Sequence, residues 1–258
     1  MTLSRRQFLG GLVTIGSTIL LGQLFSRVGA LKNGSVVNRY SNAQLSGSTK
    51  KWGMLIDLMR CNGCKACTRA CNLAHNVPEG QEWIKCFILQ ENPMSGEHWF
   101  VRPCMNCQNA PCIKVCPVGA SYYNEEGVVL IDNELCIGCR FCMAACPYGA
   151  RYFNWGEPEQ AANNPDSEST PEFANIHIKG TVEKCDYCVH FARDGTLPPC
   201  VVACPTKAIY YGDFAENAVS NADETIPLIE TLERKFGYRF KEELGTEPRV
   251  YYLPPRRD

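Results

Sequence analysis

Apolar residues are concentrated in short runs, and most of these runs predict strands. Trp52–Asp57 is almost continuously apolar, and residues 83–89 form a second run whose weak alternation predicts burial on both faces. Ser121–Tyr123 and residues 128–132 flank a Glu-Glu-Gly turn and predict a hairpin. Val250–Leu253 predicts a final strand. We therefore expect short strands to form much of the fold.

One segment has a helical period instead. Between residues 226 and 244 an apolar residue recurs every four positions, and most other positions are charged or polar. These apolar residues are Leu228, Leu232, Phe236, Phe240 and Leu244. The pattern predicts a single C-terminal amphipathic helix that packs on the rest of the chain.

The N-terminal segment has the pattern of a targeting signal. Residues 4–9 read S-R-R-Q-F-L, and residues 7–26 carry no charge but are interrupted by Gly, Ser and Thr. This order is typical of a twin-arginine export signal with a small-residue cleavage site at Val28-Gly29-Ala30. An uncleaved anchor is the alternative, because about 20 uncharged residues can just span a bilayer. The polar residues 31–51 predict a linker.

Composition and charge narrow the possible functions. With 258 residues, of which 45% are hydrophobic, the chain can bury a core without disulfide support. The net charge of −1 and the lack of a basic stripe argue against nucleic-acid binding. No dinucleotide or phosphate-binding fingerprint and no candidate triad occur, so we expect no substrate site and no catalytic residue.

The candidate chemistry lies in the cysteines. Sixteen of the 17 fall into four runs of four, spaced x2-x2-x3, x2-x4-x3, x2-x2-x3 and x2-x11-x3. The compact spacing is that of bacterial ferredoxins, in which the fourth cysteine of a run ligates the other cluster of a pair. The runs are Cys61, Cys64, Cys67 and Cys71 (run one); Cys104, Cys107, Cys112 and Cys116 (run two); Cys136, Cys139, Cys142 and Cys146 (run three); and Cys185, Cys188, Cys200 and Cys204 (run four). Sixteen ligands predict four [4Fe–4S] clusters. Zinc sites and a disulfide framework are the alternatives, but neither requires this repeated spacing.

A second repeat follows three of the runs. It reads C-P-x-[GK]-A-x-Y-[YF] after Cys116, Cys146 and Cys204, and predicts a short helix, a turn and an aromatic strand. Runs two and three are close in sequence and can form one two-cluster ferredoxin, so runs one and four become partners across it. Pairing run one with two and run three with four also satisfies the spacing.

From Trp52 to Leu253 the chain resembles the iron–sulfur (beta) subunits of the complex iron–sulfur molybdoenzymes, such as dimethyl sulfoxide, polysulfide and tetrathionate reductases. The strand Trp52–Asp57, the four spacings and the segment L-G-T-E-P-R-V-Y-Y at residues 244–252 carry the resemblance. It implies nested ferredoxin modules and a four-cluster relay. It also implies a catalytic partner with a molybdenum or tungsten pterin site, and a polytopic membrane partner that handles quinone.

The expected fold class is α+β, with two nested dicluster-ferredoxin modules, a C-terminal helix and the N-terminal signal. Residues 1–30 are assigned to the signal and 31–51 to the linker. Residues 52–95 with 181–225 form the outer module, and 96–180 form the inserted module with a polar loop at 154–180. Residues 226–258 form the C-terminal helix and tail.

Nested pairing and cross-ligation define four ligand sets. They are Cys61, Cys64, Cys67 and Cys204 (set 1, cluster 1); Cys104, Cys107, Cys112 and Cys146 (set 2, cluster 2); Cys136, Cys139, Cys142 and Cys116 (set 3, cluster 3); and Cys185, Cys188, Cys200 and Cys71 (set 4, cluster 4). Cys86 lies outside every run, and we expect a buried thiol that behaves as a small apolar residue.

Other polar residues offer weaker signals. The histidines His75, His98, His177 and His190 are scattered and predict no metal-ligand pair. Five basic residues lie beside cluster ligands, where they either raise cluster potentials or are ordinary surface charge: Lys65, Arg69, Lys114, Arg140 and Lys207.

The expected function is that of an electron-transfer subunit without a substrate of its own. It would relay electrons between a quinone-reactive membrane subunit and a molybdopterin catalytic subunit, at the outer (periplasmic) face of the cytoplasmic membrane. The twin-arginine route fits such a chain, because clusters assembled in the cytoplasm must be exported within a folded protein. The alternatives are a free exported polyferredoxin and the relay subunit of a membrane hydrogenase-type complex.

Overall fold

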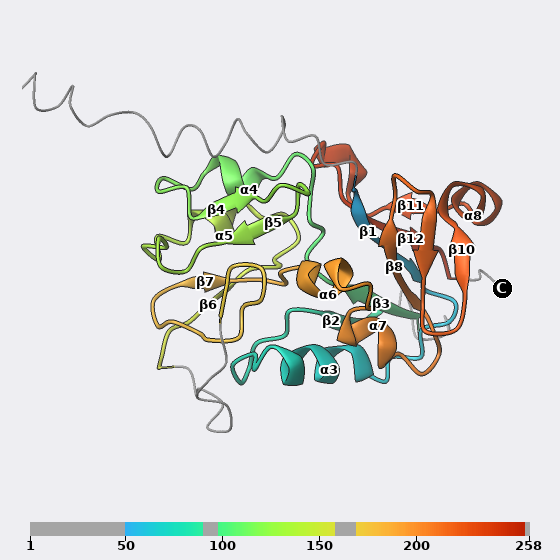
Figure 1. The fold of residues 1–258 in the computed structure, drawn as a ribbon, viewed down its shortest axis with the longest axis horizontal. Coiled ribbons are helices and arrows are strands. Elements are labelled where there is room, and N and C mark those ends of the chain that lie inside the picture. The colour runs from blue at the N-terminus through green and yellow to red at the C-terminus, as the bar shows by residue number, and fades with distance from the viewer. Residues whose placement is uncertain (1–49, 90–97, 158–168, 256–258) are drawn as a thin grey trace, which may run out of the picture. The chain divides into compact units, whose positions relative to one another are not determined.

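The computed structural model describes residues 50–89, 98–157 and 169–255, and the expected signal segment lies outside these ranges. Within them the fold is α+β (Figure 1). The strands are β1 (Trp52–Asp57), β2 (Lys85–Leu89), β3 (His98–Arg102), β4 (Ser121–Tyr123), β5 (Val129–Ile131), β6 (Tyr152–Phe153), β7 (Val182–Glu183), β8 (Ile209–Asp213), β9 (Ala218–Ser220), β10 (Thr225–Pro227), β11 (Tyr238–Arg239) and β12 (Val250–Leu253). The helices are α3 (Ala66–Ala74), α4 (Pro111–Lys114), α5 (Phe141–Ala145), α6 (Val189–Arg193), α7 (Pro199–Val202), α8 (Leu228–Lys235) and the 3-10 helix η1 (Glu242–Leu244).

A six-stranded sheet joins segments that are far apart in sequence. Its order is β10-β9-β8-β1-β12-β11, in which β1 pairs antiparallel with β8 and parallel with β12. The predicted strands Trp52–Asp57 and Val250–Leu253 are confirmed. All six residues of β1 are buried, and its alternate side chains pack in two core clusters, one with Met54 and Ile56 and the other with Leu55. Its apolar sequence is therefore explained by burial on both faces of the sheet.

Residues 98–183 are inserted in the sequence between β1, at the start of the six-stranded sheet, and β8, where the chain returns to that sheet. Helix α3, before them, packs against α7, after them. Within them, β4 and β5 form the predicted hairpin, and the Asn124 carboxamide oxygen accepts the Val128 N–H at 2.8 Å in the turn. Strands β6 and β7 pair with each other at the two ends of the polar loop, so the chain enters and leaves this loop at neighbouring positions.

The predicted burial of residues 83–89 on both faces is wrong. Strand β2 begins at Lys85 and pairs only with β3 in a two-stranded sheet. Trp83 and Ile84 are buried before it, but Phe87, Ile88 and Leu89 are exposed. The weak alternation thus reflects a buried segment followed by an exposed strand.

The single C-terminal helix predicted for residues 226–244 is also wrong. Helix α8 ends at Lys235 because Phe236 has a left-handed backbone (φ 54°) and the Gly237 N–H donates to the Leu232 carbonyl at 2.8 Å. Phe236 is exposed, and the chain continues through β11 and η1. The four-residue spacing of apolar residues therefore spans three elements.

None of the helices in the described ranges is both long and apolar enough to cross a membrane.

Candidate metal centres

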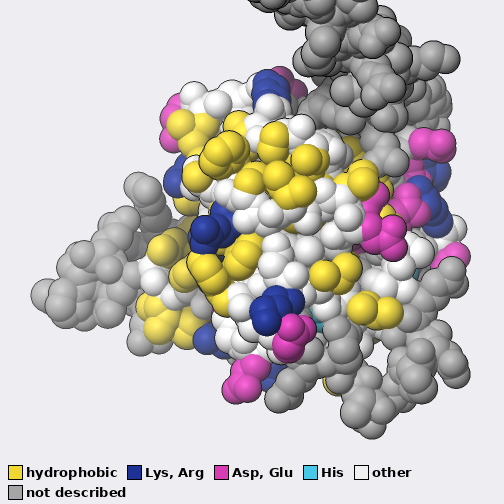
Figure 2. Space-filling view, turned by 90° about the vertical axis from the view of Figure 1, so that its left-hand side faces the viewer, with side chains coloured by type: hydrophobic (Ala, Val, Ile, Leu, Met, Phe, Trp, Pro, Cys, Tyr) yellow, Lys and Arg dark blue, Asp and Glu magenta, His cyan; other side chains and the backbone are white. Residues whose placement is uncertain are grey.

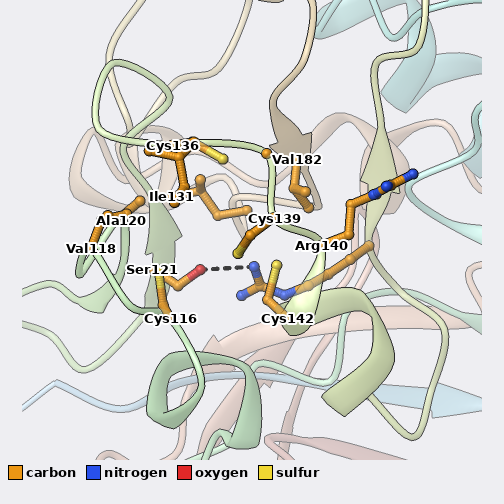
Figure 3. Close-up of a pocket in the computed structure, with 13 residues that line it drawn as sticks. Cys116, Val118, Ala120, Ser121, Ile131, Cys136, Cys139, Arg140, Cys142 and Val182 are labelled. Carbon is orange, nitrogen blue, oxygen red and sulfur yellow. Dashed lines mark hydrogen bonds between the residues drawn. The ribbon is translucent and has the colours of Figure 1, made fainter.

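The four cysteines of set 3 line one pocket. Cys116 follows α4, Cys142 is on α5, and Cys136 and Cys139 lie in the loop before α5. Figure 3 shows the sulfurs of Cys136, Cys139 and Cys142 in this pocket. The remaining wall is largely apolar and includes Val118, Ile131 and Val182. Residues from two sequence runs thus form a single thiol-lined site.

Set 2 lines a second pocket of the same kind. Cys104, Cys107 and Cys112 come from run two, and Cys146 comes from the end of run three. Met105 and Val129 are among the apolar residues of its wall. The pockets of sets 2 and 3 therefore exchange their fourth cysteines, as cross-ligation requires.

The other two sets combine runs one and four. Cys67 interacts electrostatically with Cys204 and Cys61, and Cys71 interacts with Cys185 and Cys200. These interactions follow from the packing of α3, which carries Cys67 and Cys71, against α7, which carries Cys200. The structure thus brings run one to run four across the intervening segment.

The loop of each run has a residue with a left-handed backbone before its second cysteine. These residues are Gly63 (φ 70°), Asn106 (φ 44°), Gly138 (φ 67°) and Tyr187 (φ 66°). Left-handed residues next to right-handed ones direct successive N–H groups into a concave nest that binds anionic groups. A cluster ligated by four thiolates is such a group, so the loop backbones suit its charge.

Burial opposes ionisation of these thiols in the metal-free chain. It raises the pKa of Cys185 to about 12 and, with neighbouring thiolates, raises the pKa of Cys71 and Cys200 well above the usual range. Bound iron supplies the positive charge that makes a buried thiolate stable. The sites therefore favour a group that carries several cations.

The arrangement excludes two of the alternatives from the sequence. All 17 cysteines are free, so they form no disulfide framework. A tetrahedral zinc site with bonds of about 2.3 Å would hold its sulfurs about 3.8 Å apart. Among the described residues, which include every cysteine, no three cysteine sulfurs lie within 4.8 Å of one another. The four-thiol sets are thus too wide for one zinc ion and fit a larger polynuclear group.

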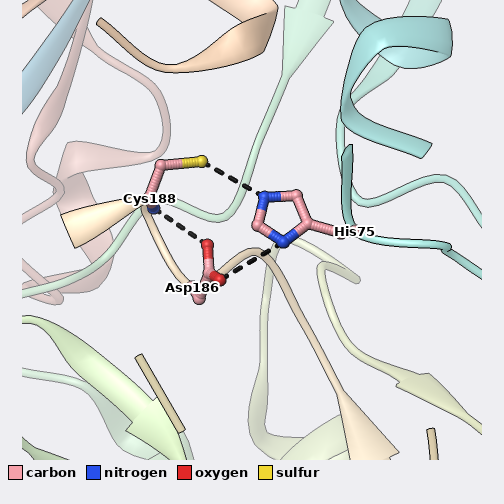
Figure 4. Close-up of side chains that lie close together, drawn as sticks. All are labelled: His75, Asp186 and Cys188. Carbon is pink, nitrogen blue, oxygen red and sulfur yellow. Dashed lines mark hydrogen bonds and ion pairs between the residues drawn. The ribbon is translucent and has the colours of Figure 1, made fainter. Parts of the chain in front are cut away.

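His75 belongs to a buried cluster that the sequence did not predict. Its Nε2 lies 3.3 Å from Sγ of Cys188, and its Nδ1 lies 3.2 Å from the Ala174 carbonyl and 3.4 Å from Asp186 (Figure 4). Asp186 also accepts the Cys188 N–H at 2.8 Å. His75 lies four residues after the last cysteine of run one, at the position where the other three runs have alanine. This difference was the sequence signal that could have revealed the cluster.

The other histidines differ in their environments. Nε2 of His177 donates to the His75 carbonyl at 2.9 Å, so the described end of the polar loop is packed inside the protein. The ring of His190 packs against those of Phe173 and His75. His98 is a half-buried residue at the start of β3. Three of the four scattered histidines therefore meet beside set 4.

Cys86 is buried as predicted, but it is also a neighbour of set 1. A hydrogen bond with its side chain lowers the pKa of the Cys61 thiol to about 6. In the same pair, the Cys61 thiolate raises the pKa of Cys86, so Cys86 remains the protonated donor. Its role is thus more specific than that of an apolar residue.

The basic residues beside the ligands are mostly on the surface. Lys65, Arg69, Lys114 and Arg140 are exposed, and Lys207 pairs with Asp223 at 3.5 Å. Buried cations near the thiols include Lys184, beside Cys185, and Arg151, which lines the pockets of both set 2 and set 3. Sequence reasoning missed Arg151 because it lies five residues after Cys146, farther from a ligand in sequence than any of the five residues considered.

Two protein families that bind [4Fe–4S] clusters match segments that contain runs one to three. The family described as "4Fe-4S dicluster domain" matches residues 97–162, and the family described as "4Fe-4S binding domain" matches residues 52–73. A selenate reductase subunit from Mesobacillus selenatarsenatis is 39% identical over 219 residues, covering 79% of this chain and 72% of that protein. The iron-sulfur cluster-binding subunit of menaquinone reductase from Nitratidesulfovibrio vulgaris is 38% identical, covering 80% of this chain and 89% of that protein.

A third relative spans almost the whole chain. Protein NrfC of Escherichia coli is 35% identical over 263 residues, covering 98% of this chain and 96% of that protein. The relatives match far more of the chain than the cysteine runs alone. Together with the two 4Fe-4S matches, they identify the chain as an iron–sulfur electron-transfer subunit. The chain belongs to the family of iron–sulfur (beta) subunits of the complex iron–sulfur molybdoenzymes.

Proposed function

We propose that this chain relays electrons through four [4Fe–4S] clusters, one in each ligand set. The relay connects a quinone-reactive membrane subunit with a molybdopterin catalytic subunit of a respiratory oxidoreductase. Each bound cluster carries one electron at a time. The residues of the chain supply the thiolates, exclude water and set the potentials.

The serial proximity of the four sets is the observation that carries this proposal. Cys142 of set 3 interacts electrostatically with Cys112 of set 2, and Cys104 of set 2 interacts with Cys185 of set 4. Cys200 of set 4 in turn interacts with Cys67 of set 1. The sets therefore follow one another in the order 3, 2, 4, 1, as a linear relay requires.

The two ends of this series lie closer to the surface than set 4. In set 1, Cys64 is exposed and Cys61 is half-buried, and in set 3 three of the four cysteines are half-buried. Two of the four cysteines of set 2 are half-buried, and all four of set 4 are buried. Electrons can thus enter and leave at sets 1 and 3, while the thiols of set 4 are protected from solvent.

An apolar surface near set 3 supports contact with a partner subunit. Leu135, Ile137 and Phe141, on either side of the set 3 cysteines, are exposed. Figure 2, which views the side of the molecule with α5 and β4 to β7, shows hydrophobic side chains gathered on that face. Exposed apolar groups of this kind are typical of subunit interfaces.

The sequence and the relatives support the proposed setting. Two relatives are named as subunits of selenate reductase and menaquinone reductase, which is consistent with a catalytic and a membrane partner. The motif S-R-R-Q-F-L at residues 4–9 supports export by the twin-arginine route to the outer face of the cytoplasmic membrane. The outer module then comprises 52–95 with 181–225, and the inserted module 96–180.

The substitution Cys146→Ser tests the relay. It removes a ligand of set 2, an inner site, so we expect iron content to fall below 16 per chain and quinone-linked turnover of the complex to stop. Turnover with an artificial viologen donor should persist, because the dye reduces the catalytic subunit directly. Both activities and iron would be measured in membranes and in purified complex.

Cys86→Ser is the matched control, because it removes the cysteine outside every set. We expect about 16 iron and 16 sulfide per chain and near-normal quinone-linked turnover, since all 16 proposed ligands remain. Full quinone-linked turnover in Cys146→Ser, or an iron content near eight in the unmodified chain, would contradict the proposal. Isolation without a pterin-containing partner would instead favour a free polyferredoxin.

A further inference from the structure

Arg151 is a buried cation between the pockets of sets 2 and 3. It is 4% exposed and contributes to the lining of both pockets. Its Nη1 donates to Oγ of Ser121 at 2.8 Å (dashed line in Figure 3), whereas its Nη2 is buried without a hydrogen-bond partner. No carboxylate in the described ranges forms an ion pair with it. Besides the Ser121 hydroxyl, the guanidinium interacts with the thiols of Cys112 and Cys142 and, among the described residues, with no carboxylate.

Burying a guanidinium in this way costs free energy of folding unless a negative charge lies nearby. Moving a guanidinium from water to a protein interior costs several kcal/mol even after relaxation. Burial accordingly lowers the pKa of Arg151, but the thiolates of Cys112, Cys142 and Cys104 outweigh that effect and raise it overall. Cys112 and Cys104 belong to set 2, and Cys142 belongs to set 3. The compensating negative charge thus comes from both sets.

The repeat shows why one residue reaches both pockets. Arg151 and Ser121 occupy the same position in C-P-x-[GK]-A-x-Y-[YF], five residues after Cys146 and Cys116 respectively. The hydrogen bond between them means that these equivalent positions meet between the two sites. The corresponding residue after Cys204 is Ile209, which is buried in β8. The charge is therefore a specific addition to the inserted segment.

We propose that Arg151 is the shared counter-ion of the two clusters bound by sets 2 and 3, and that it raises the reduction potentials of both. This inference rests on the ligand sets of the proposed function. A reduced cluster carries one more negative charge than an oxidised one, so a fixed cation nearby favours reduction. Because the guanidinium is buried, its field is screened far less than that of a surface arginine.

The test compares Arg151→Gln with Arg140→Gln in the complete, anaerobically purified complex. Arg140 is next to Cys139 in sequence but is exposed, and in Figure 3 its side chain turns away from the sulfurs. Reduction potentials would be measured by redox titration followed by electron paramagnetic resonance, together with iron content. We expect two potentials to shift downward in Arg151→Gln, and a much smaller shift in Arg140→Gln that disappears at high salt.

A second variant keeps the inference testable if Arg151→Gln loses its clusters. Arg151→Lys retains the charge but lacks the planar fork that can donate in two directions. We expect normal iron content and a downward shift of the same two potentials that is smaller than the shift expected on full loss of the charge. Unchanged potentials at full iron content, or a shift of only one cluster in either variant, would overturn the inference.

The number of clusters in the unmodified chain tests the proposed function independently of the Arg151 variants. If the unmodified chain contains fewer than four [4Fe–4S] clusters, the proposed function fails whatever the variants do. If it contains four and Arg151→Gln has unaltered potentials, the relay stands and only the role of Arg151 is rejected.

Discussion

Side chains that are not ligands surround the thiols with hydrogen-bond donors. His75 lies against Cys188, Cys86 against Cys61, and Arg151 between sets 2 and 3. Hydrogen bonds to cluster sulfurs are among the main influences on the potential of an iron–sulfur cluster. At the scale of single residues, we therefore expect neighbours of the ligands to set differences in potential between the proposed clusters.

The substitution His75→Leu should lower the potential of the cluster in set 4. It removes Nε2, which lies 3.3 Å from Sγ of Cys188 and can donate to that sulfur once Cys188 is a thiolate ligand, and it replaces the ring by a side chain of similar size. A hydrogen bond to a charged group is worth about 1.5–3 kcal/mol, and only part of it changes on reduction, so we expect a shift of tens of mV. Redox titration of that cluster measures it.

His190→Leu is the control for this prediction. The His190 ring packs against that of His75, and its Nδ1 donates to the Glu172 carbonyl at 2.9 Å, away from the thiols. It should leave the potential unchanged. An equal shift in both variants would mean that packing, and not the hydrogen bond to Cys188, determines the effect.

The residue scale is also where sequence reasoning reached least far. The candidate ligands were found from spacing, because three of the four thiols of each set come from a single run, although the fourth comes from another run. Contacts such as His75 with Asp186 join residues more than 100 positions apart, and no periodicity encodes them. Arg151 and His75 were nevertheless visible as odd members of the repeat, since each replaces a smaller residue at an equivalent position.

At the scale of elements, the ligand loops are constrained more tightly than the helices and strands. Gly138 has φ +67°, and a Cβ there would lie 2.1 Å from the Gly180 carbonyl oxygen. That oxygen belongs to the segment leading to β7, so the loop of run three is fixed against a distant part of the chain. The packing leaves room for only a hydrogen at this position.

We therefore expect Gly138→Ala to lose the cluster of set 3, about four of 16 iron atoms. Iron analysis and the number of resonance signals would measure the loss. Gly149→Ala is the control: its φ is also positive (+57°), but a Cβ would meet nothing closer than 3.9 Å. It should cost only the strain of a left-handed alanine, about 1–2 kcal/mol, and retain all iron. Equal iron content in both variants would contradict this.

The hairpin was predicted correctly because nearby residues specify all of it. The end of the C-terminal helix and the burial of β2 were predicted wrongly because they depend on features that the apolar pattern does not show. The hairpin β4–β5 has its turn and both strands within eleven residues, and it is confirmed. The helix expected over 226–244 failed because Gly237 ends α8, although the four-residue apolar spacing continues. The burial of β2 failed because sequence does not reveal how many strands a sheet contains.

At the scale of the whole molecule, much of the hydrophobic core consists of the cysteines themselves. Nine cysteines belong to the main buried cluster, whereas Leu55, Tyr210, Val219, Leu228 and Leu253 form a second core without cysteine. Helices α4, α5, α6 and α7 have four or five residues each and no side-chain cap, so they depend on their surroundings. Metal removal should thus affect the two cores differently.

We expect iron removal to unfold the short helices and spare the central sheet. After oxidation and chelation, amide hydrogens of α4 to α7 should exchange within seconds, while those of β1 and β8 remain protected. Hydrogen exchange with mass spectrometry measures both, and helical circular dichroism should fall. Uniform protection after iron loss, or uniform exchange throughout, would show that the cysteine-rich and cysteine-free cores are not independent.

The pairing of β1 with β12 also determines the order in which the chain can fold during its synthesis. The first described strand cannot gain its parallel neighbour until residues 250–253 have left the ribosome, nor its antiparallel neighbour until residues 209–213 have done so. Every cysteine of sets 2 and 3, by contrast, has been translated by residue 146. A nascent chain therefore offers sets 2 and 3 for maturation early and sets 1 and 4 late. Closure of β1 requires translation through residue 253, so any machinery that accepts only folded chains rejects products that are truncated before that residue.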